Sequence, residues 1–220
     1  MVDTDATKLA ERLERIYTGV VYDVMRDAGK TVGTLPPDIR PLLPEGNLAG
    51  PVFTVSGEVD ESLDVHHTML EWTGFLEQAA PGHVVVCQPH DSTIAHMGEL
   101  SAETLQLRGV RGYIVDGGCR DTDFIKNIGF PVWRRYDTPS DIRGRWAPTA
   151  FEEPVVIGDV TIRNGDFVLA DRDGIVLIPR QDAAEVVAEA EEAQQQENLV
   201  RKAIREGMSP KAAYLKYGKF

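Results

Sequence analysis

The chain has 220 residues, with 23 lysines and arginines against 35 aspartates and glutamates, so its formal net charge is -12. A surface this negative repels phosphate backbones and anionic lipid heads, and no concentrated basic region offsets it, so neither nucleic acid nor a membrane is an expected partner. With 42% hydrophobic and 26% charged residues, the composition is that of one globular domain with a substantial core.

The apolar runs and the cysteines indicate the cellular compartment. Runs such as residues 84–87 are far too short to cross a bilayer, and residues 1–5 are too acidic for a secretory signal. Cys87 and Cys119 make neither a disulfide framework nor a thiolate metal cage. We therefore expect a cytoplasmic protein. If a chain with this net negative charge binds an anionic metabolite, it must do so through a local positive centre, either an arginine or a metal.

The first two thirds of the chain alternate between helix and strand patterns. The hydrophobic spacing predicts helices over 6–17 and 20–28, and a proline- and glycine-rich connection over 33–51 follows. The elements predicted next, in order, are a strand over 52–57, a helix over 69–80, a strand over 84–87, a helix opening at 98–101, a strand over 113–115, a helix over 122–128 and a strand over 131–133. This order predicts an α/β layered arrangement with crossover connections.

The last third changes character. Short β-branched runs over 154–157, 160–162, 167–170 and 174–178 are separated by glycine- and aspartate-rich turns, which is typical of hairpins in a mixed sheet. A long acidic helix is predicted over 181–205 and a short one over 210–217. No interdomain linker interrupts the pattern, so residues 1–220 are expected to form one domain.

The strongest chemical signal is the segment Asp116-Gly117-Gly118-Cys119-Arg120-Asp121, just past a predicted buried strand. Ligands of α/β sheets collect at that edge, and consecutive glycines allow a ligand to approach the backbone. There an arginine can grip a carboxylate while an aspartate holds a hard cation. A solvated surface turn explains the same residues about as well.

The second signal is Gly98-Glu99-Leu100-Ser101, where a loop turns into a helix. Free N–H groups at a helix start favour an anion, although plain helix capping is the commoner reason for such a stretch. The histidines are less persuasive. His66 and His67 would point to opposite faces of a strand, and His90 and His96 lack the spacing of a helical zinc pair, so none is assigned as a metal ligand.

Two other interpretations of the glycine segment fail. A dinucleotide-binding loop needs a glycine where Cys119 stands, so binding of a dinucleotide or of S-adenosylmethionine is rejected. Cys119 is also a weak candidate nucleophile, because no histidine lies nearby in the sequence.

Six segments carry a further signal when they are taken together: 98–100, 109–121, 129–133, 164–166, 170–176 and 213–218. These segments resemble one known family across essentially the whole chain. The family contains the regulator of ribonuclease E activity A (RraA) and the 4-hydroxy-4-methyl-2-oxoglutarate and 4-carboxy-4-hydroxy-2-oxoadipate aldolases. The resemblance implies an α/β/β/α sandwich similar to the swivelling phosphohistidine domain, assembled as homotrimers or hexamers. It also implies that the helical arm over 180–220 packs on a neighbouring subunit.

The resemblance also implies a site. Arg120 would bind a pyruvate moiety and act in catalysis, and Asp121 would ligate Mg²⁺ or Mn²⁺ directly. Substrate would also contact Gly98, Glu99, Leu100 and Ser101, while Glu99 and, from the neighbouring subunit, Glu197 would reach the metal through water. Mg²⁺ commonly takes only one or two protein carboxylates, so this set is chemically reasonable.

The activity implied by the resemblance is a retro-aldol cleavage of a small branched 4-hydroxy-2-oxo acid to pyruvate, with Glu99 helping to move the proton. Oxaloacetate decarboxylation passes through the same enolate and is an expected companion. Two alternatives stand beside it: a non-catalytic regulator of a ribonuclease or helicase, and an aldolase or lyase for sugar-derived 2-oxo acids. The segment 138–146 looks like an insertion, and its arginines would contact either a distal substrate carboxylate or a neighbouring subunit.

Overall fold

The computed structural model describes residues 4–220. Residues 1–3, part of the segment judged too acidic for a secretory signal, lie outside the described residues. The helices are α1 (Thr4–Leu13), α2 (Thr18–Asp27), α3 (Val65–Gln78), α4 (Glu99–Leu107), α5 (Thr122–Ile128), α6 (Ala183–Arg205) and α7 (Pro210–Tyr217), with a 3-10 turn at Arg180–Asp182. In the described chain, no helix is both long enough and apolar enough to cross a membrane.

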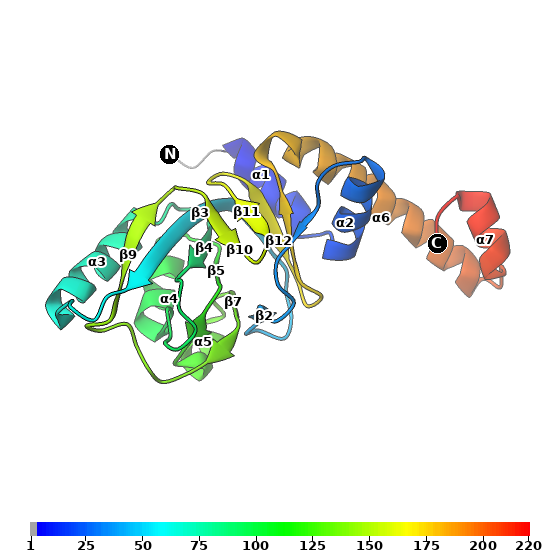
Figure 1. Ribbon diagram of the computed structural model, residues 1–220. Helices are drawn as coiled ribbons and strands as arrows, with labels where there is room; N and C mark the ends of the chain where they lie inside the picture. Colours follow the sequence, from blue (N-terminus) through cyan, green and yellow to red (C-terminus); the bar gives the residue numbers. More distant parts are fainter. Residues whose placement is uncertain (1–3) are drawn as a thin grey trace.

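A mixed sheet organises the fold (Figure 1). Its strands run in the order β1 (Gly33–Thr34), β13 (Ile175–Ile178), β12 (Phe167–Ala170), β3 (Leu48–Val59), β4 (Val84–Gln88), β5 (Gly112–Val115), β7 (Val132–Arg134) and β2 (Arg40–Pro41), and β9 (Trp146–Phe151) also pairs with β3. Two small pairs join β10 (Val155–Ile157) with β11 (Val160–Ile162), and β6 (Gly118–Cys119) with β8 (Tyr136–Asp137). The run β3, β4, β5 and β7 is parallel, as the predicted crossovers require.

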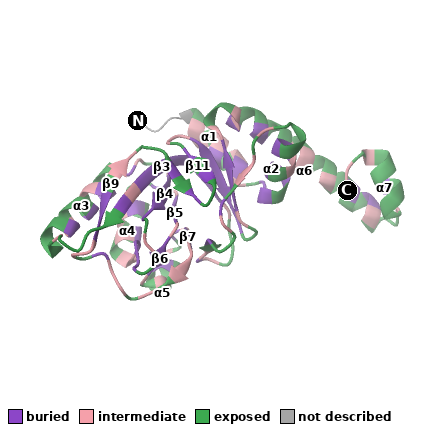
Figure 2. Ribbon diagram, viewed as in Figure 1, coloured by how far each residue is buried: buried purple, intermediate pink, exposed green. Residues whose placement is uncertain are grey.

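Three hydrophobic cores show that this sheet folds over into two layers. One core lies between β4 or β5 and the antiparallel strands β12 and β13, and it includes Val86, Ile114 and Leu177. A second core packs α3, α4 and α5 against the parallel strands, and a third packs α1, α2 and α6 against the antiparallel strands. Buried strands therefore lie inside, with helices outside (Figure 2). The predicted α/β/β/α sandwich is confirmed.

Most predicted strands are present, and the largest error falls at the N-terminus. The expected helix over 6–17 ends at Leu13, and Tyr17 precedes a second helix that starts at Thr18 rather than at residue 20. The buried carboxylate of Asp171 accepts the backbone N–H of Thr18 at 2.8 Å and its hydroxyl at 2.9 Å. This contact comes from a turn more than 150 positions away, so local spacing did not reveal it.

The second error concerns the paired histidines. Helix α3 starts at Val65, four residues before its predicted start, because Asp64 caps it by accepting the backbone N–H of His67 at 2.7 Å. His66 and His67 are therefore exposed residues in the first turn of a helix, and the expectation that they flank a strand is wrong.

Candidate functional site

The two segments singled out in the sequence, 98–101 and 116–121, lie next to each other beyond the carboxyl ends of β4 and β5. The backbone N–H of Arg120 donates to the carbonyl of Met97 at 2.9 Å, and the N–H of His96 donates to the carbonyl of Gly118 at 2.9 Å. These two bonds align the segment before α4 with the segment before α5. The starts of both helices are consequently held at one edge of the sheet, where parallel sheets bind ligands.

Asp121 has an unusual backbone. Its φ of 56° and ψ of 33° lie in the left-handed region, which a residue other than glycine adopts at a cost. It occupies the cap position of α5 yet makes no side-chain bond to that helix. Instead its carboxylate accepts the backbone N–H of Glu99, in the first turn of α4, at 3.3 Å. The strained backbone thus turns the carboxylate toward the segment 98–101.

Gly98 has no side chain, and the carboxylate of Asp121 lies in the space that one would fill. A Cβ atom at Gly98 would lie 2.9 Å from Oδ2 of Asp121 and 3.2 Å from Nε of Arg120, closer than side-chain atoms normally approach. The absence of a side chain therefore lets both charged groups fold against the start of α4.

The guanidinium of Arg120 is held between two carboxylates. Its Nε lies 3.3 Å from Oδ2 of Asp121, and its Nη1 donates to Oδ2 of Asp141 at 3.0 Å. Asp141 lies in the segment 138–146, whose arginines rather than its aspartate drew attention in the sequence. Among residues 4–220, the Nη2 group of Arg120 donates to no protein acceptor. One terminal nitrogen is thus available to an anionic ligand.

These groups line a pocket of about 390 Å³. The predicted residues Gly98, Glu99, Leu100 and Ser101 all border it, together with Arg120 and Asp121. The side chain of Leu100 is 76% exposed at its rim. The hydroxyl of Ser101 accepts the indole N–H of Trp72 at 2.9 Å, which fixes this residue to α3.

The two glycines of the motif serve packing. A Cβ at Gly117 would lie 2.7 Å from Nδ1 of His96, and a Cβ at Gly118 would lie 2.6 Å from the carbonyl oxygen of Ile94. The expectation that these glycines admit a ligand to the backbone is therefore wrong, since the protein itself fills that space.

His96 borders the pocket and is fully buried. Among residues 4–220 neither ring nitrogen has a hydrogen-bond partner, and Nε2 lies 3.6 Å from Oδ2 of Asp91. Burial lowers the pKa of His96 to about 4, against the opposing charge of Asp91. The ring is consequently neutral at physiological pH and packs edge-on against Trp146, with 5.1 Å between ring centroids.

Cys119 lies within the motif but is fully buried. Burial is the main cause that raises the pKa of its thiol to about 12. Because the thiolate is the reactive form, this cysteine is an inert part of the core at neutral pH.

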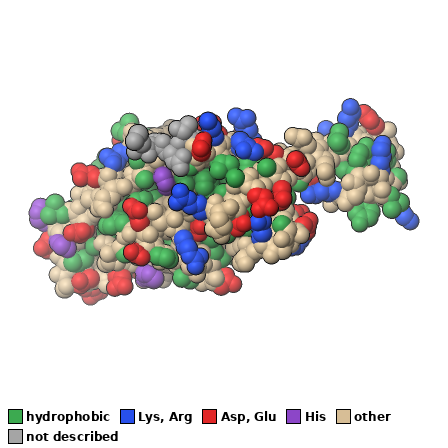
Figure 3. Space-filling model, turned by 90° about the horizontal axis from the view of Figure 1, so that it is seen from above, with side chains coloured by type: hydrophobic (Ala, Val, Ile, Leu, Met, Phe, Trp, Pro, Cys, Tyr) green, Lys and Arg blue, Asp and Glu red, His purple; other side chains and the backbone are tan. Residues whose placement is uncertain are grey.

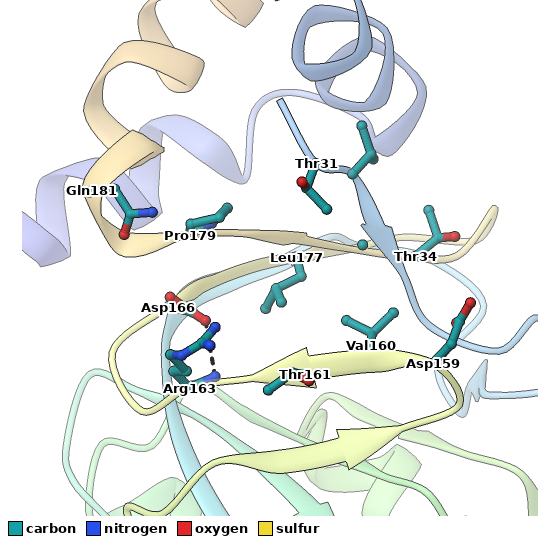
Figure 4. Close-up of a pocket in the computed structure, with 12 residues that line it drawn as sticks. Thr31, Thr34, Asp159, Val160, Thr161, Arg163, Asp166, Leu177, Pro179 and Gln181 are labelled. Carbon is teal, nitrogen blue, oxygen red and sulfur yellow. Dashed lines mark hydrogen bonds between the residues drawn. The ribbon is translucent and has the colours of Figure 1, made fainter. Parts of the chain in front are cut away.

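A larger cavity lies elsewhere and carries none of the predicted chemistry. It measures about 820 Å³ and lies beside β1, β11 and the end of β13 (Figure 4). Its buried carboxylate, Asp166, already accepts the backbone N–H groups of Arg163 and Arg180, each at 3.0 Å. Size alone does not mark the functional site, and the convergence of charged groups favours the smaller pocket.

Glu197 is not brought to this pocket within one chain. It lies on α6, against the other layer of the sandwich from α4 and α5 (Figure 1). Its carboxylate accepts the hydroxyl of Tyr17 and lies 3.7 Å from Nζ of Lys219. Within one chain, this carboxylate therefore does not reach Arg120.

The donor atoms at the pocket suit a hard divalent cation. Among residues 4–220, no group of three or more His, Cys, Asp or Glu is placed to hold a metal ion. Mg²⁺ does not need such a cage, because it binds through one or two carboxylates and keeps several waters. Asp121 fits this requirement, because its carboxylate borders the pocket and occupies space that a side chain at Gly98 would fill.

Comparisons with known proteins point to one family. The model of the RraA-like family, described as Aldolase/RraA, matches residues 18–177. A relative from Halalkalibacterium halodurans, named "Putative 4-hydroxy-4-methyl-2-oxoglutarate aldolase", is 29% identical over 86% of this chain and 87% of its own length.

Two solved structures share the fold. An uncharacterised protein from Pseudomonas syringae pv. tomato is 27% identical, with a TM-score of 0.85, over 96% of this chain and 95% of its own. RraAS2 of Streptomyces coelicolor, described as an unusual member of the RNase ES inhibitor RraA family, is 27% identical, with a TM-score of 0.76, over 88% of this chain and 96% of its own. The chain therefore belongs to the RraA-like family.

Proposed function

We propose that the protein is a divalent-metal-dependent aldolase that cleaves a branched 4-hydroxy-2-oxo acid, of the 4-hydroxy-4-methyl-2-oxoglutarate or 4-carboxy-4-hydroxy-2-oxoadipate type, to pyruvate. The observation that carries the proposal is the meeting of Arg120 and Asp121 with the start of α4 in one pocket. The relative from Halalkalibacterium halodurans, whose name contains the same activity, supports it.

The chain supplies an anion-binding set for the 2-oxo acid end of this substrate. Arg120 would donate its free Nη2 to the substrate carboxylate, and charge-assisted bonds of this kind are about twice as strong as neutral ones. The backbone N–H groups in the first turn of α4, including that of Leu100, would add partial positive charge to the same end. The anion is thus oriented by Arg120 and by the helix together.

The remaining residues have roles in the cleavage itself. Mg²⁺ or Mn²⁺ bound by Asp121 would supply a Lewis acid that stabilises negative charge on the enolate oxygen. Glu99 would take up the proton of the substrate 4-hydroxyl. The bond between C3 and C4 would then break, C4 would become the carbonyl carbon of the second product, and the electrons of the broken bond would form the enolate of pyruvate. Protonation at C3 then yields pyruvate. Loss of carbon dioxide from oxaloacetate gives the same enolate, so decarboxylase activity is part of the proposal.

The decisive experiment measures pyruvate release with Mg²⁺, with excess EDTA, and after Mg²⁺ is restored. We expect activity to disappear with the chelator and to return with the metal. Full activity in excess EDTA would contradict the metal role, and no pyruvate release from any branched 4-hydroxy-2-oxo acid would contradict the aldolase.

We also propose that residues 180–220 form an arm that packs on a neighbouring subunit, in a trimer or hexamer. Helix α7 stands away from the sandwich at the end of α6 (Figure 1), and hydrophobic side chains lie open on this lobe (Figure 3). Leu199, Tyr214, Leu215 and Phe220 are between 53% and 75% exposed. Packing on a second copy would cover them and bring a Glu197 toward the pocket.

A second candidate function is regulation of a ribonuclease or helicase, favoured by the similarity to RraAS2. A net charge of -12 suits association with a basic partner. A pull-down against ribonuclease, combined with an assay on a panel of 2-oxo acids, separates this function from the aldolase.

A further inference from the structure

Residues 141–143, in the segment 138–146 between β8 and the start of β9, form one wall of the pocket. Three hydrogen bonds fix the position of the segment 138–146. The backbone N–H of Thr138 donates to the carbonyl of Cys119 at 3.0 Å, and the backbone N–H of Ala95 donates to the carbonyl of Ser140 at 2.8 Å. The backbone N–H of Gly144 donates to the hydroxyl of Thr68 at 3.1 Å. A wall held at three points presents its side chains to the pocket in a defined place.

Three arginines surround Asp141, and the guanidinium groups of two of them lie close to its carboxylate. Arg120 donates to its carboxylate at 3.0 Å. Arg145 donates to its carbonyl at 2.5 Å and to the hydroxyl of Ser140 at 2.9 Å, with its charge 3.8 Å from the carboxylate. Asp141 therefore shares its single negative charge between these two side chains.

Arg143 differs from its two neighbours. Its backbone N–H donates to Oδ1 of Asp141 at 3.2 Å, but among residues 4–220 its guanidinium has no hydrogen-bond or ion-pair partner. The side chain is exposed and lines the same pocket as Arg120. Asp141 thus links the guanidinium of Arg120, on one side, to the backbone of Arg143 on the other.

We infer that Arg143 determines specificity by binding a second carboxylate, at the far end of the substrate from the group held by Arg120. The inference deepens the proposed function and rests on it for the orientation of the ligand. With one end of a 2-oxo acid at Arg120, a ligand reaching along residues 141–143 would meet Arg143, whose guanidinium is not paired with Asp141. A planar guanidinium suits a carboxylate in that position. Arg143 would therefore be the residue that favours the acids named above, which carry a distal carboxylate, over monocarboxylic 2-oxo acids.

The test compares two ligands of equal carbon number. 2-Oxoglutarate carries the distal carboxylate and 2-oxopentanoate lacks it, and neither has the 4-hydroxyl that cleavage requires, so both remain intact. Calorimetric affinities are measured with Mg²⁺ for the unaltered protein, for Arg143→Gln, and for Arg172→Gln, an exposed arginine outside the pocket.

We expect Arg143→Gln to lower the affinity for 2-oxoglutarate about tenfold, as expected for loss of a partly exposed charge-assisted hydrogen bond. The affinity for 2-oxopentanoate should change less than about twofold. Arg172→Gln should change neither affinity. Equal weakening of both ligands, unchanged binding of 2-oxoglutarate, or equal affinity of the unaltered protein for both ligands would overturn the inference.

The proposed function fails separately. If the unaltered protein prefers 2-oxoglutarate through Arg143 but releases no pyruvate from hydroxylated acids, the aldolase assignment is wrong and the second carboxylate site stands. If pyruvate is released but Arg143→Gln leaves the preference unchanged, the assignment of Arg143 is wrong and the aldolase stands.

Discussion

The carboxylate of Asp121 accepts the backbone N–H of Glu99 at 3.3 Å, so a side chain at the start of α5 bonds to the first turn of α4. An aspartate at a cap position ordinarily bonds to its own helix. Here the left-handed backbone of Asp121 directs its carboxylate to the pocket instead. The strained residue is thus one of the charged residues of the candidate site, where such strain is commonly found.

We predict that Asp121→Asn abolishes activity while preserving the fold. Asparagine tolerates the left-handed conformation and can still accept from Glu99, but it lacks the negative charge that a divalent cation requires. Pyruvate release should fall about a hundredfold or more, as for loss of a charged transition-state group. Thermal unfolding should hardly change.

The matched control is Asp123→Asn, two positions along the same helix, where the carboxylate is 91% exposed. It should leave turnover unchanged. Asp121→Ala should lose activity, and its unfolding free energy should also fall by about 1 kcal/mol, because the left-handed backbone is less favourable for alanine than for aspartate. Undiminished turnover in Asp121→Asn would remove Asp121 from the metal site.

A second prediction concerns Gly98→Ala. The new Cβ would lie 2.9 Å from Oδ2 of Asp121 and 3.2 Å from Nε of Arg120, so both side chains must shift. Side chains that border a pocket can shift cheaply, so unfolding should change little. The displaced carboxylate and guanidinium should lower turnover at least about tenfold, since small displacements of reacting groups are costly.

Gly74→Ala provides the comparison, because a Cβ at Gly74 in α3 meets nothing within 4 Å. It should raise the unfolding free energy by up to about 1 kcal/mol through helix propensity and leave turnover unchanged. Equal activity of Gly98→Ala and the unaltered protein would show that the close approach at Gly98 is immaterial.

Local patterns revealed the layers of this fold because they repeat over many residues. The buried runs at β4 and β5 and the turn-separated runs from β10 to β13 predicted strands on nearly their observed bounds. Contacts between distant segments were not predictable in this way. The break between α1 and α2 depends on Asp171, and β9 pairs antiparallel with the far end of β3.

The candidate site was predictable in its residues and not in its geometry. Arg120 and Asp121 stood out as adjacent charges after a buried strand, but their bonds to Asp141 and Glu99 depend on side-chain directions that spacing does not specify. The role of Asp141 was not predictable, because one aspartate among arginines in a loop has no periodic pattern. A glycine pair that packs against His96 has the same local sequence as one that admits a ligand.

The third prediction is a loss of stability in mild acid that depends on His96. Its folded-state pKa of about 4 lies below the ordinary value of 6.5. The unfolded chain therefore binds the proton more readily, so this stability is complete above about pH 6.5 and is lost as the pH falls toward 4. At pH 4.5 the loss should be about 2 kcal/mol.

His96→Leu tests this by chemical denaturation at pH 7 and pH 4.5. An apolar replacement loses no side-chain hydrogen bond, because among residues 4–220 both ring nitrogens lack partners. The acid-induced loss of stability should be about 2 kcal/mol smaller in the variant than in the unaltered protein. Parallel losses in both proteins would mean that His96 titrates normally in the folded state.

The fourth prediction tests whether Glu197 acts across a subunit boundary. In one chain this carboxylate accepts the hydroxyl of Tyr17 and lies on the opposite layer from Arg120. Arg120→Ala and Glu197→Gln should each be nearly inactive alone. If a site needs Arg120 from one subunit and Glu197 from the next, refolding equal amounts together should restore about a quarter of the activity, since each intact residue is present half the time.

Random mixing must be verified by native mass spectrometry of the assemblies. Refolding unaltered protein with Arg120→Ala serves as the control, and its activity should follow the fraction of intact Arg120. Because the arm over 180–220 carries exposed Leu199, Leu215 and Phe220, shielding these residues gives subunits a physical reason to associate. No recovery of activity in verified mixed assemblies, or full activity of Glu197→Gln alone, would remove Glu197 from the neighbouring site and leave the arm with a purely structural role.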